Sequence, residues 1–219
     1  MPRRRTVPLP RGPGRPSAET ADHRQRLLDA ALRCFVGAGI AATSLREVAK
    51  QAGVTPALVH YYFGSKEQLV AAVFAERLQP VFEELRAQLG TVVAGNLVSG
   101  LVAGVHRTVE RHPWLPALWV REILTEGGAL REGMLTRVAP NLAPVLAKRF
   151  AELQRAGGLN PDLDPRLLVV SIIGLTLFPL AAEGIWRRVF PDAGLDHSVL
   201  RQHTLALFDA GLENRDARA

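Results

Sequence analysis

Apolar residues recur every three or four positions near the start of the chain, which is the spacing of one face of an α-helix. The stripe consists of Leu27, Leu28, Ala31, Leu32 and Phe35. Two glycines, Gly37 and Gly39, end the pattern. We therefore predict a first helix over residues 18–38 that packs beneath the elements following it.

The next part of the chain contains two short helical patterns joined by a glycine. Ser44 followed three residues later by Glu47 is a capping box, which marks a helix start. Gly53 ends that helix. Thr55 and Pro56 then give a second start, because proline at the first helical position loses no hydrogen bond. A turn this short makes the two helices cross steeply, so we predict a helix-turn-helix, with an ordinary helical hairpin as the alternative.

Helical patterns continue to the end of the chain. We expect a fourth helix after Ser65 and later helices at about 94–111, 114–127, 129–157, 165–189 and 196–213. Proline removes an intrahelical hydrogen bond and clashes one turn back. Pro140 and Pro144 should therefore interrupt or kink the helix at 129–157, and Pro179 the helix at 165–189. Strand signals are absent from the sequence, so the predicted fold class is all-α.

Positive charge is concentrated at one end of the chain. Residues 1–66 hold eleven Lys and Arg against four Asp and Glu, a balance of +7, whereas residues 67–219 hold sixteen against seventeen. Solubility requires no such concentration. A polyanion is therefore the partner that the charge distribution favours, and we expect the N-terminal third to bind nucleic acid.

Residues 1–17 contain five Arg, five Pro and no acidic residue. This composition is too polar and too rich in proline to fold alone, so we expect a flexible arm. Its Gly-Pro-Gly-Arg-Pro-Ser segment resembles the core of an AT-hook, and Arg11 and Arg15 are the candidates for the minor groove. A cationic tail that adds affinity without reading sequence is the alternative.

Other protein classes are disfavoured. One cysteine, Cys34, cannot form an internal disulfide and suits a reducing cytoplasm. The basic N-terminus lacks the apolar region of a signal peptide, and the apolar run at 167–182 is shorter than the roughly 20 residues of a membrane span. Common nucleophile, phosphate-loop, dinucleotide and zinc-protease motifs are missing. We expect a cytoplasmic protein without catalytic activity, metal or cofactor.

The helix-turn-helix segment carries a characteristic set of residues, namely Gly53, Val54, Thr55, Tyr62, Phe63, Ser65, Lys66 and Glu67. With these residues the chain resembles the TetR family of bacterial transcriptional regulators over about residues 22–75. The resemblance implies an all-α fold with an N-terminal three-helix helix-turn-helix DNA-binding domain and a C-terminal helical domain for ligand binding and dimerisation. The expected division is a flexible arm at 1–17, the DNA-binding domain at 18–65 and the helical domain at 66–219.

The resemblance also implies the residues that contact DNA. Phosphate contacts are expected from Thr43, Ser44, Tyr61 and Lys66, and base-edge contacts from Arg46, Pro56, Ala57, Leu58 and His60. Thr55 and Tyr62 belong to the same candidate surface, with a place partly in the core as the alternative for Tyr62. Arg46 is suited to bidentate pairing with guanine, whereas Ala57 and Leu58 offer only apolar contact to thymine methyl groups.

Ligand contacts are expected in the C-terminal part, because ligand pockets are mostly apolar with a few oriented polar groups. The apolar candidates are Trp114, Trp119, Met134, Phe178 and Trp186, and the polar candidates are His106, Arg121, Glu122 and Glu126. The alternative is that the apolar residues form an ordinary core. In that case Arg121, Glu122 and Arg131 would form structural ion pairs.

From the resemblance we expect a homodimeric repressor that binds an inverted-repeat operator in double-stranded DNA and pairs through the helices near 165–189 and 196–213. A small, largely apolar ligand would release it by favouring a dimer with badly spaced recognition helices. A ligand-independent DNA-binding or architectural protein is the alternative, and activation instead of repression also stays open.

Overall fold

The structure, a computed structural model, describes residues 18–191 and 194–212, and over these residues every regular element is a helix and none is a strand. The α-helices are α1 (Ala18–Ala38), α2 (Leu45–Ala52), α3 (Pro56–Phe63), α4 (Lys66–Val73), α5 (Gln79–Gly90), α6 (Leu97–Arg111), α7 (Leu115–Leu118), α8 (Arg131–Gly133), α9 (Ala139–Arg155), α10 (Pro165–Ala181), α11 (Glu183–Val189) and α12 (His197–Leu212). The predicted all-α fold class is confirmed.

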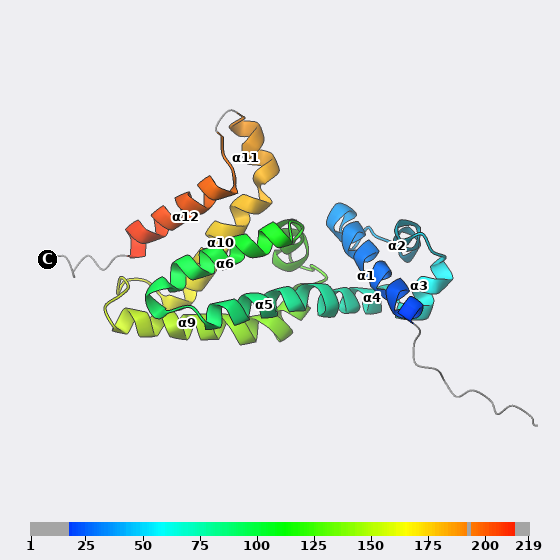
Figure 1. Cartoon of the computed structure of the whole chain (residues 1–219), viewed down its shortest axis with the longest axis horizontal. Coiled ribbons are helices and arrows are strands. Elements are labelled where there is room, and N and C mark those ends of the chain that lie inside the picture. Colours follow the sequence, from blue (N-terminus) through cyan, green and yellow to red (C-terminus); the bar gives the residue numbers. More distant parts are fainter. Residues whose placement is uncertain (1–17, 192–193, 213–219) are drawn as a thin grey trace, which may run out of the picture.

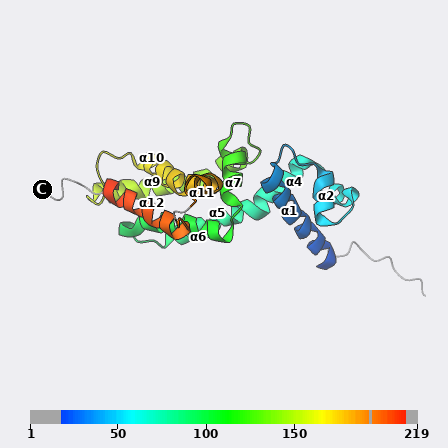
Figure 2. The same ribbon diagram turned by 90° about the horizontal axis from the view of Figure 1, so that it is seen from above.

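The helices form two groups along the long axis of the molecule. Figure 1 shows α1–α3 at one end and α6 with α9–α12 at the other, with α4 and α5 running from the first group into the second. The view from above in Figure 2 shows the same separation. The continuous path through α4 and α5 therefore joins the two ends mechanically.

The N-terminal group is held by a core that α1 shares with its neighbours. The apolar stripe predicted for α1 is buried, and it packs with Val48 of α2, Val59 of α3 and Leu69 of α4. The same core continues into Phe82 of α5 and Met134. The expected domain boundary after residue 65 is thus not a break in packing.

A second core fills the C-terminal group around α10. Ile172 and Phe150 are fully buried there, together with Leu101 of α6 and Phe208 of α12. α10 packs against α6, α7, α9, α11 and α12. This central position explains the apolar residues on the buried face of α10, such as Leu168, Val169 and Leu177. Among the described residues no single helix is long and apolar enough to cross a membrane, although α10 and α11 pass that test as a pair bent by 65°.

Three π-helical turns interrupt the expected helices, at Phe74–Leu78, Trp119–Leu124 and Met134–Val138. Two of them end two residues before a proline, Pro80 and Pro140. Proline has no N–H and clashes with the carbonyl one turn back, and the wider turn relieves both problems. Pro140 was expected to interrupt its helix and does so in this way.

The other prolines behave differently. Pro144 lies inside α9, which runs on to Arg155. α10 passes Pro179 and ends at Ala181, and the 65° bend follows between α10 and α11. The single helix expected at 165–189 is therefore two helices.

Charged side chains tie α1 to the turn that follows α4. Arg24 donates to both carboxylate oxygens of Glu76 at 2.6 Å, and its guanidinium also lies 5.3 Å from the ring centroid of Phe63. Arg77 donates to Asp29 at 2.7 Å. Hydrogen bonds from Arg24 hold the pKa of Glu76 below its ordinary value. A bidentate charged pair fixes the relative orientation of its two side chains. These contacts therefore hold α1 in one orientation relative to the helices α4 and α5.

This ion pair predicts an acid-dependent loss of stability. Because the folded pKa of Glu76 is lowered, its contribution is complete above the ordinary carboxyl value of 4.5 and is lost as pH falls through the folded value. Glu76→Gln should lower Tm by about 2–4 °C at pH 7 and by less at pH 3. Thermal unfolding followed by circular dichroism measures the difference in Tm between the variant and the unaltered chain at each pH. Glu132→Gln is the control, because Glu132 is exposed and forms no ion pair within the described residues. If Glu76→Gln lowered Tm equally at both pH values, the stabilising role of the Arg24–Glu76 ion pair would be contradicted.

Candidate nucleic-acid interface and helical-domain cavity

The capping box predicted at the start of α2 is present. Glu47 N–H donates to the Ser44 hydroxyl at 3.2 Å, and Ser44 N–H donates to the Glu47 carboxylate at 2.6 Å. The bond from the Ser44 backbone lowers the pKa of Glu47. Gly53 ends α2 with φ +70°, a left-handed conformation that glycine adopts without strain. Local sequence signals therefore fix both ends of this helix.

α3 presents one face to the core and one to solvent. Val59 and Phe63 are buried, whereas Pro56, Ala57 and His60 are exposed. Thr55 precedes the helix in an extended conformation, but its side chain makes no capping hydrogen bond, so proline at the start carries the signal. The outward face of α3 is thus available for an external partner.

The remaining expected DNA contacts surround this face. Ser44, Arg46 and Tyr61 are exposed, Tyr61 to 77% of its surface. Leu58, Tyr62 and Lys66 are half-buried. An exposed aromatic ring and an exposed arginine on adjacent helices suit phosphate and base contacts.

Two of these side chains are anchored by the protein itself. His60 Nδ1 lies 2.9 Å from the Gly64 carbonyl oxygen at the end of α3. Lys66 Nζ donates to the Ala41 carbonyl at 2.9 Å and so links the start of α4 to the loop before α2. Their polar ends are therefore held in place near the interface.

Thr43 corrects one expectation. Its side chain is only 4% exposed, and its hydroxyl donates to the Gly39 carbonyl at 2.8 Å. It therefore stabilises the turn between α1 and α2 and does not offer a phosphate contact at the surface. Arg11 and Arg15, the candidates for minor-groove contact, lie outside the described residues.

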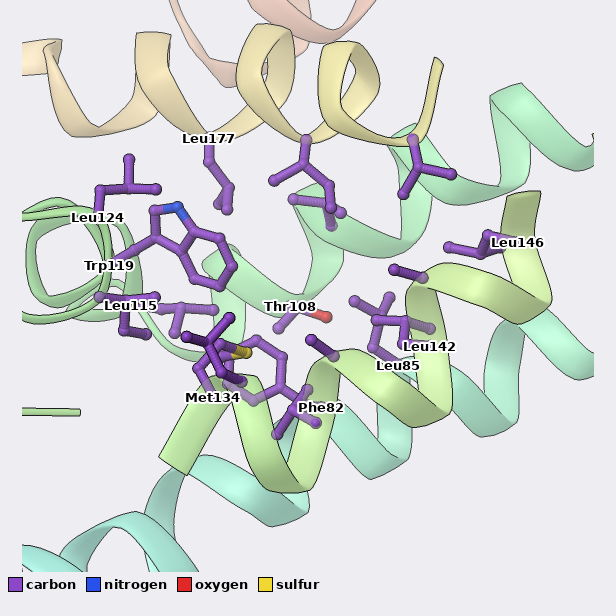
Figure 3. Close-up of a pocket in the computed structure, with 18 of the residues that line it drawn as sticks. Phe82, Leu85, Thr108, Leu115, Trp119, Leu124, Met134, Leu142, Leu146 and Leu177 are labelled. Carbon is purple, nitrogen blue, oxygen red and sulfur yellow. The ribbon is translucent and has the colours of Figure 1, made fainter. Parts of the chain in front are cut away.

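The helical group contains a cavity of about 310 Å³ with an almost entirely apolar wall. Figure 3 shows Leu115, Trp119 and Leu124 toward one end of it and Leu146 toward the other. The wall is formed by Phe82, Leu85, Leu101, Val105, Thr108, Leu115, Trp119, Ile123, Leu124, Arg131, Met134, Leu135, Val138, Ala139, Leu142, Ala143, Leu146, Val169, Ile173 and Leu177. The volume is at the lower end of the range for small-molecule sites.

Of the expected ligand contacts, Trp119 and Met134 line this cavity. The other apolar candidates lie elsewhere. Trp114 packs edge-on against His112, Phe178 is 68% exposed on α10, and Trp186 donates its indole N–H to the Pro179 carbonyl. Aromatic residues were the main apolar ligand contacts expected from the sequence, but most of the cavity wall consists of Leu, Val and Ala.

The polar candidates also lie outside the cavity wall. His106 is buried on α6, which packs against α12, and its Nε2 atom has no hydrogen-bond partner among the residues that the structure describes. Burial is the main cause that lowers its pKa, with the nearby charges of Arg201 and His197 adding to it. Glu126 is exposed.

Arg121 and Glu122 instead join the two ends of the molecule. The buried Glu122 carboxylate accepts from Ile40 N–H at 2.9 Å and from Ala129 N–H at 3.3 Å. Arg121 donates to the carbonyl oxygens of Val36 and Gly37 at the end of α1. Cationic groups at a helix C-terminus are favourable. We call these contacts of Arg121 and Glu122 with residues 36–40 the α1 clasp.

The α1 clasp and the cavity share one π turn. Trp119, Ile123 and Leu124 line the cavity, and Arg121 and Glu122 lie between them in sequence. The structural ion pairs considered for Arg121 and Glu122 are replaced by hydrogen bonds to backbone groups of α1, the loop after it and Ala129. No spacing in the sequence indicated the contacts with α1 and the loop after it, because those partners are more than 80 positions away.

Comparison with known proteins finds a family match for the N-terminal helices and relatives of similar sequence. Residues 27–73, from α1 to the end of α4, match the family described as bacterial regulatory proteins, tetR family. The chain is 37% identical over 98 residues to the HTH-type transcriptional regulator BetI of Rhizobium meliloti, with 44% of this chain and 48% of that protein covered. It thus spans about half the length of this curated relative.

Solved structures match over most of the chain. The transcriptional regulator FadR of Bacillus subtilis, in complex with stearoyl-CoA, superposes with a TM-score of 0.64 at 20% identity, and the match covers 86% of this chain and 98% of that chain. A protein of Saccharomonospora viridis in complex with choline superposes with a TM-score of 0.64 at 19% identity and covers 89% and 100%. At this identity the likeness concerns the fold. The match over α1–α4 assigns residues 27–73 to the TetR family of bacterial regulatory proteins.

Proposed function

We propose that the chain is a cytoplasmic, homodimeric transcriptional regulator that binds an inverted-repeat operator through α2 and α3 and responds to a small, largely apolar ligand in the cavity. The observation that carries the proposal is the exposed outer face of α3 beside the capped start of α2, within the segment that matches the family. A helix presented in this way enters the major groove while the helix before it lies across the backbone.

Within this surface, we assign base contact to Arg46 and phosphate contact to Ser44, Tyr61 and Lys66. Arg46 is exposed and forms no ion pair in the described part of the chain. Its guanidinium is therefore free to pair with guanine. Pro56, Ala57, Leu58 and His60 offer mainly apolar or single contacts, so the shape of the DNA contributes to the choice of site.

Dimer formation is supported by an apolar surface on α10 and α11. Leu167, Val170 and Phe178 of α10 and Ile185 and Val189 of α11 are each at least 60% exposed. Monomeric proteins rarely expose so many large apolar side chains together. In Figure 1 α11 projects away from the rest of the C-terminal helices, which leaves it accessible to a second copy.

Ligand response is supported by the shared π turn. A ligand that displaces Trp119 or Ile123 acts on the same turn from which Arg121 and Glu122 contact the end of α1. Movement of α1 changes the spacing of the two α3 helices, which must lie about 34–36 Å apart to reach successive major grooves. A coupling of about 1–3 kcal/mol would change operator affinity 5- to 150-fold. The solved relatives bind chemically different ligands, so comparison alone does not choose one.

Arg46→Ala should abolish sequence preference. Selection from fragmented genomic DNA at about 0.15 M salt should enrich an inverted repeat with the unaltered chain. Arg46→Ala should bind that repeat about 10- to 100-fold more weakly, because a bidentate base contact contributes about 1–3 kcal/mol. Arg86→Ala is the control: it removes the same charge from an exposed position on α5. Salt-sensitive binding without enrichment would instead support an architectural protein.

Phe178→Glu should convert dimer to monomer, because it places a charge in the proposed apolar interface. Light scattering coupled to size-exclusion chromatography, at about 10 μM protein, should show the mass fall by half. Val93→Glu is the control, because Val93 is 72% exposed but lies outside α10–α12. A monomeric unaltered chain, or an unchanged mass for the variant, would rule out this interface.

Glu122→Gln should loosen the α1 clasp, because an amide cannot accept hydrogen bonds at both of its polar atoms. We expect operator affinity to fall about fivefold, equivalent to about 1 kcal/mol for one lost hydrogen bond. Binding of the apolar dye Nile red to the cavity should not change, since Glu122 does not line it. Glu126→Gln, at an exposed glutamate in the loop after the π turn that carries Glu122, provides the control. Unaltered operator affinity for Glu122→Gln would refute a role of the clasp in DNA binding.

A further inference from the structure

The polar groups of the cavity wall restrict the kind of ligand that it can hold. Among its lining residues only Thr108, Trp119 and Arg131 carry side-chain polar atoms other than sulfur, and there is no Asp or Glu. The wall therefore has no counter-charge for a cation. It has one fixed positive charge, that of Arg131.

Two of these groups offer hydrogen-bond donors. The Trp119 indole N–H makes no hydrogen bond to any described residue; the ring contacts Phe82 at a centroid distance of 6.1 Å. The Arg131 guanidinium has five N–H groups and, within the described part of the chain, makes a single long contact of 3.4 Å, with the Leu124 carbonyl. Both side chains thus retain donors that can bind an acceptor.

The Thr108 hydroxyl is not available to donate a hydrogen bond to a ligand. Its hydroxyl donates to the Gly104 carbonyl within α6 at 2.8 Å, so its only proton is already used. A ligand hydroxyl or ammonium group placed deep in the cavity would find few acceptors. The chemistry of the wall therefore favours a ligand whose polar end accepts hydrogen bonds.

The position of Arg131 indicates how such a ligand would lie. Leu124 and Leu135 line the cavity yet are 58% and 53% exposed, which places the opening beside them. Arg131 is exposed and contacts Leu124, so it stands at this opening. Leu146 and Val169 are buried at 2% and 3% exposure and close the inner part. Figure 3 shows Leu124 and Leu146 toward opposite ends.

The volume limits the length of the apolar part. A cavity of about 310 Å³ corresponds to roughly ten water molecules at about 30 Å³ each. A methylene group is of similar size. An unbranched chain of roughly ten carbons therefore fills the space.

We propose that the effector is a medium-chain carboxylate, with its head group bound by Arg131 and Trp119 at the opening and its alkyl chain extending toward Leu146. This inference rests on the proposed function, because it takes the cavity to be the effector site. It excludes cationic amphiphiles, which would place a positive charge beside Arg131 without a partner. Charge-assisted hydrogen bonds to a carboxylate are stronger than those to a neutral acceptor.

The test compares three ligands that share a ten-carbon chain: decanoate, 1-decanol and decyltrimethylammonium. Binding to the purified full chain, without DNA, is measured by tryptophan fluorescence and titration calorimetry below the concentrations at which micelles form. We expect saturable binding of decanoate, at least tenfold weaker binding of decanol and no saturable binding of decyltrimethylammonium. Binding of the cation as tightly as decanoate, or no binding of any of the three, would overturn the proposal.

Arg131→Gln locates the head group. This variant should weaken decanoate about tenfold and leave decanol unchanged, whereas Arg155→Gln, which removes an exposed arginine of α9 outside the wall, should alter neither. Equal decanoate affinity in both variants would remove Arg131 from the site. Because DNA is absent, these results are independent of operator selection. Decanoate binding without operator enrichment would refute the proposed function alone, and enrichment without decanoate binding would refute only the ligand.

Discussion

Glu122 can remain buried only because backbone N–H groups from two separate segments reach its carboxylate. Ile40 belongs to the loop that leads into α2, and Ala129 to the loop after the π turn that carries Glu122. A buried charged group without such partners would be strongly destabilising. The end of α1 and the cavity wall are therefore held at one distance and one angle. The position of α3 relative to the cavity depends on this arrangement.

Gly39 makes the close approach possible. Its φ of +86° is left-handed, and a Cβ atom there would lie 3.1 Å from Arg121 Cδ. A residue with a side chain would strain the backbone at this φ and would crowd the Arg121 side chain. In the sequence this glycine was read only as the end of the first helix. Its role in joining the two halves became visible only in three dimensions.

Local signals were sufficient for the N-terminal helices. The spacing of Ser44 and Glu47, the left-handed Gly53 and the proline at the start of α3 depend on neighbours within a few positions, so sequence alone predicted them. Thr43 was misassigned because its hydroxyl bonds back to Gly39, a competition that composition does not reveal.

The cavity was much less predictable. The same three- and four-residue spacing places a leucine in a solid core or in the wall of a space, and only the packing of α5, α6, α9 and α10 decides between them. Three tryptophans were expected as apolar ligand contacts, yet of these only Trp119 lines the cavity. Arg131 was considered only as a structural ion-pair partner, because its place at the opening depends on where Leu124 and Leu135 emerge.

The π turn at Phe74–Leu78 determines how far α5 is rotated about the helix axis relative to α4. An α-helix advances about 100° per residue, and this turn lies between Leu69 of α4 and Phe82 of α5. Leu69 packs in the core that α1 shares with its neighbours, whereas Phe82 lines the cavity. Loss of one residue here would rotate one face by about 100° relative to the other. The number of residues in this turn thus sets the rotation of the N-terminal helices α1–α3 relative to the cavity.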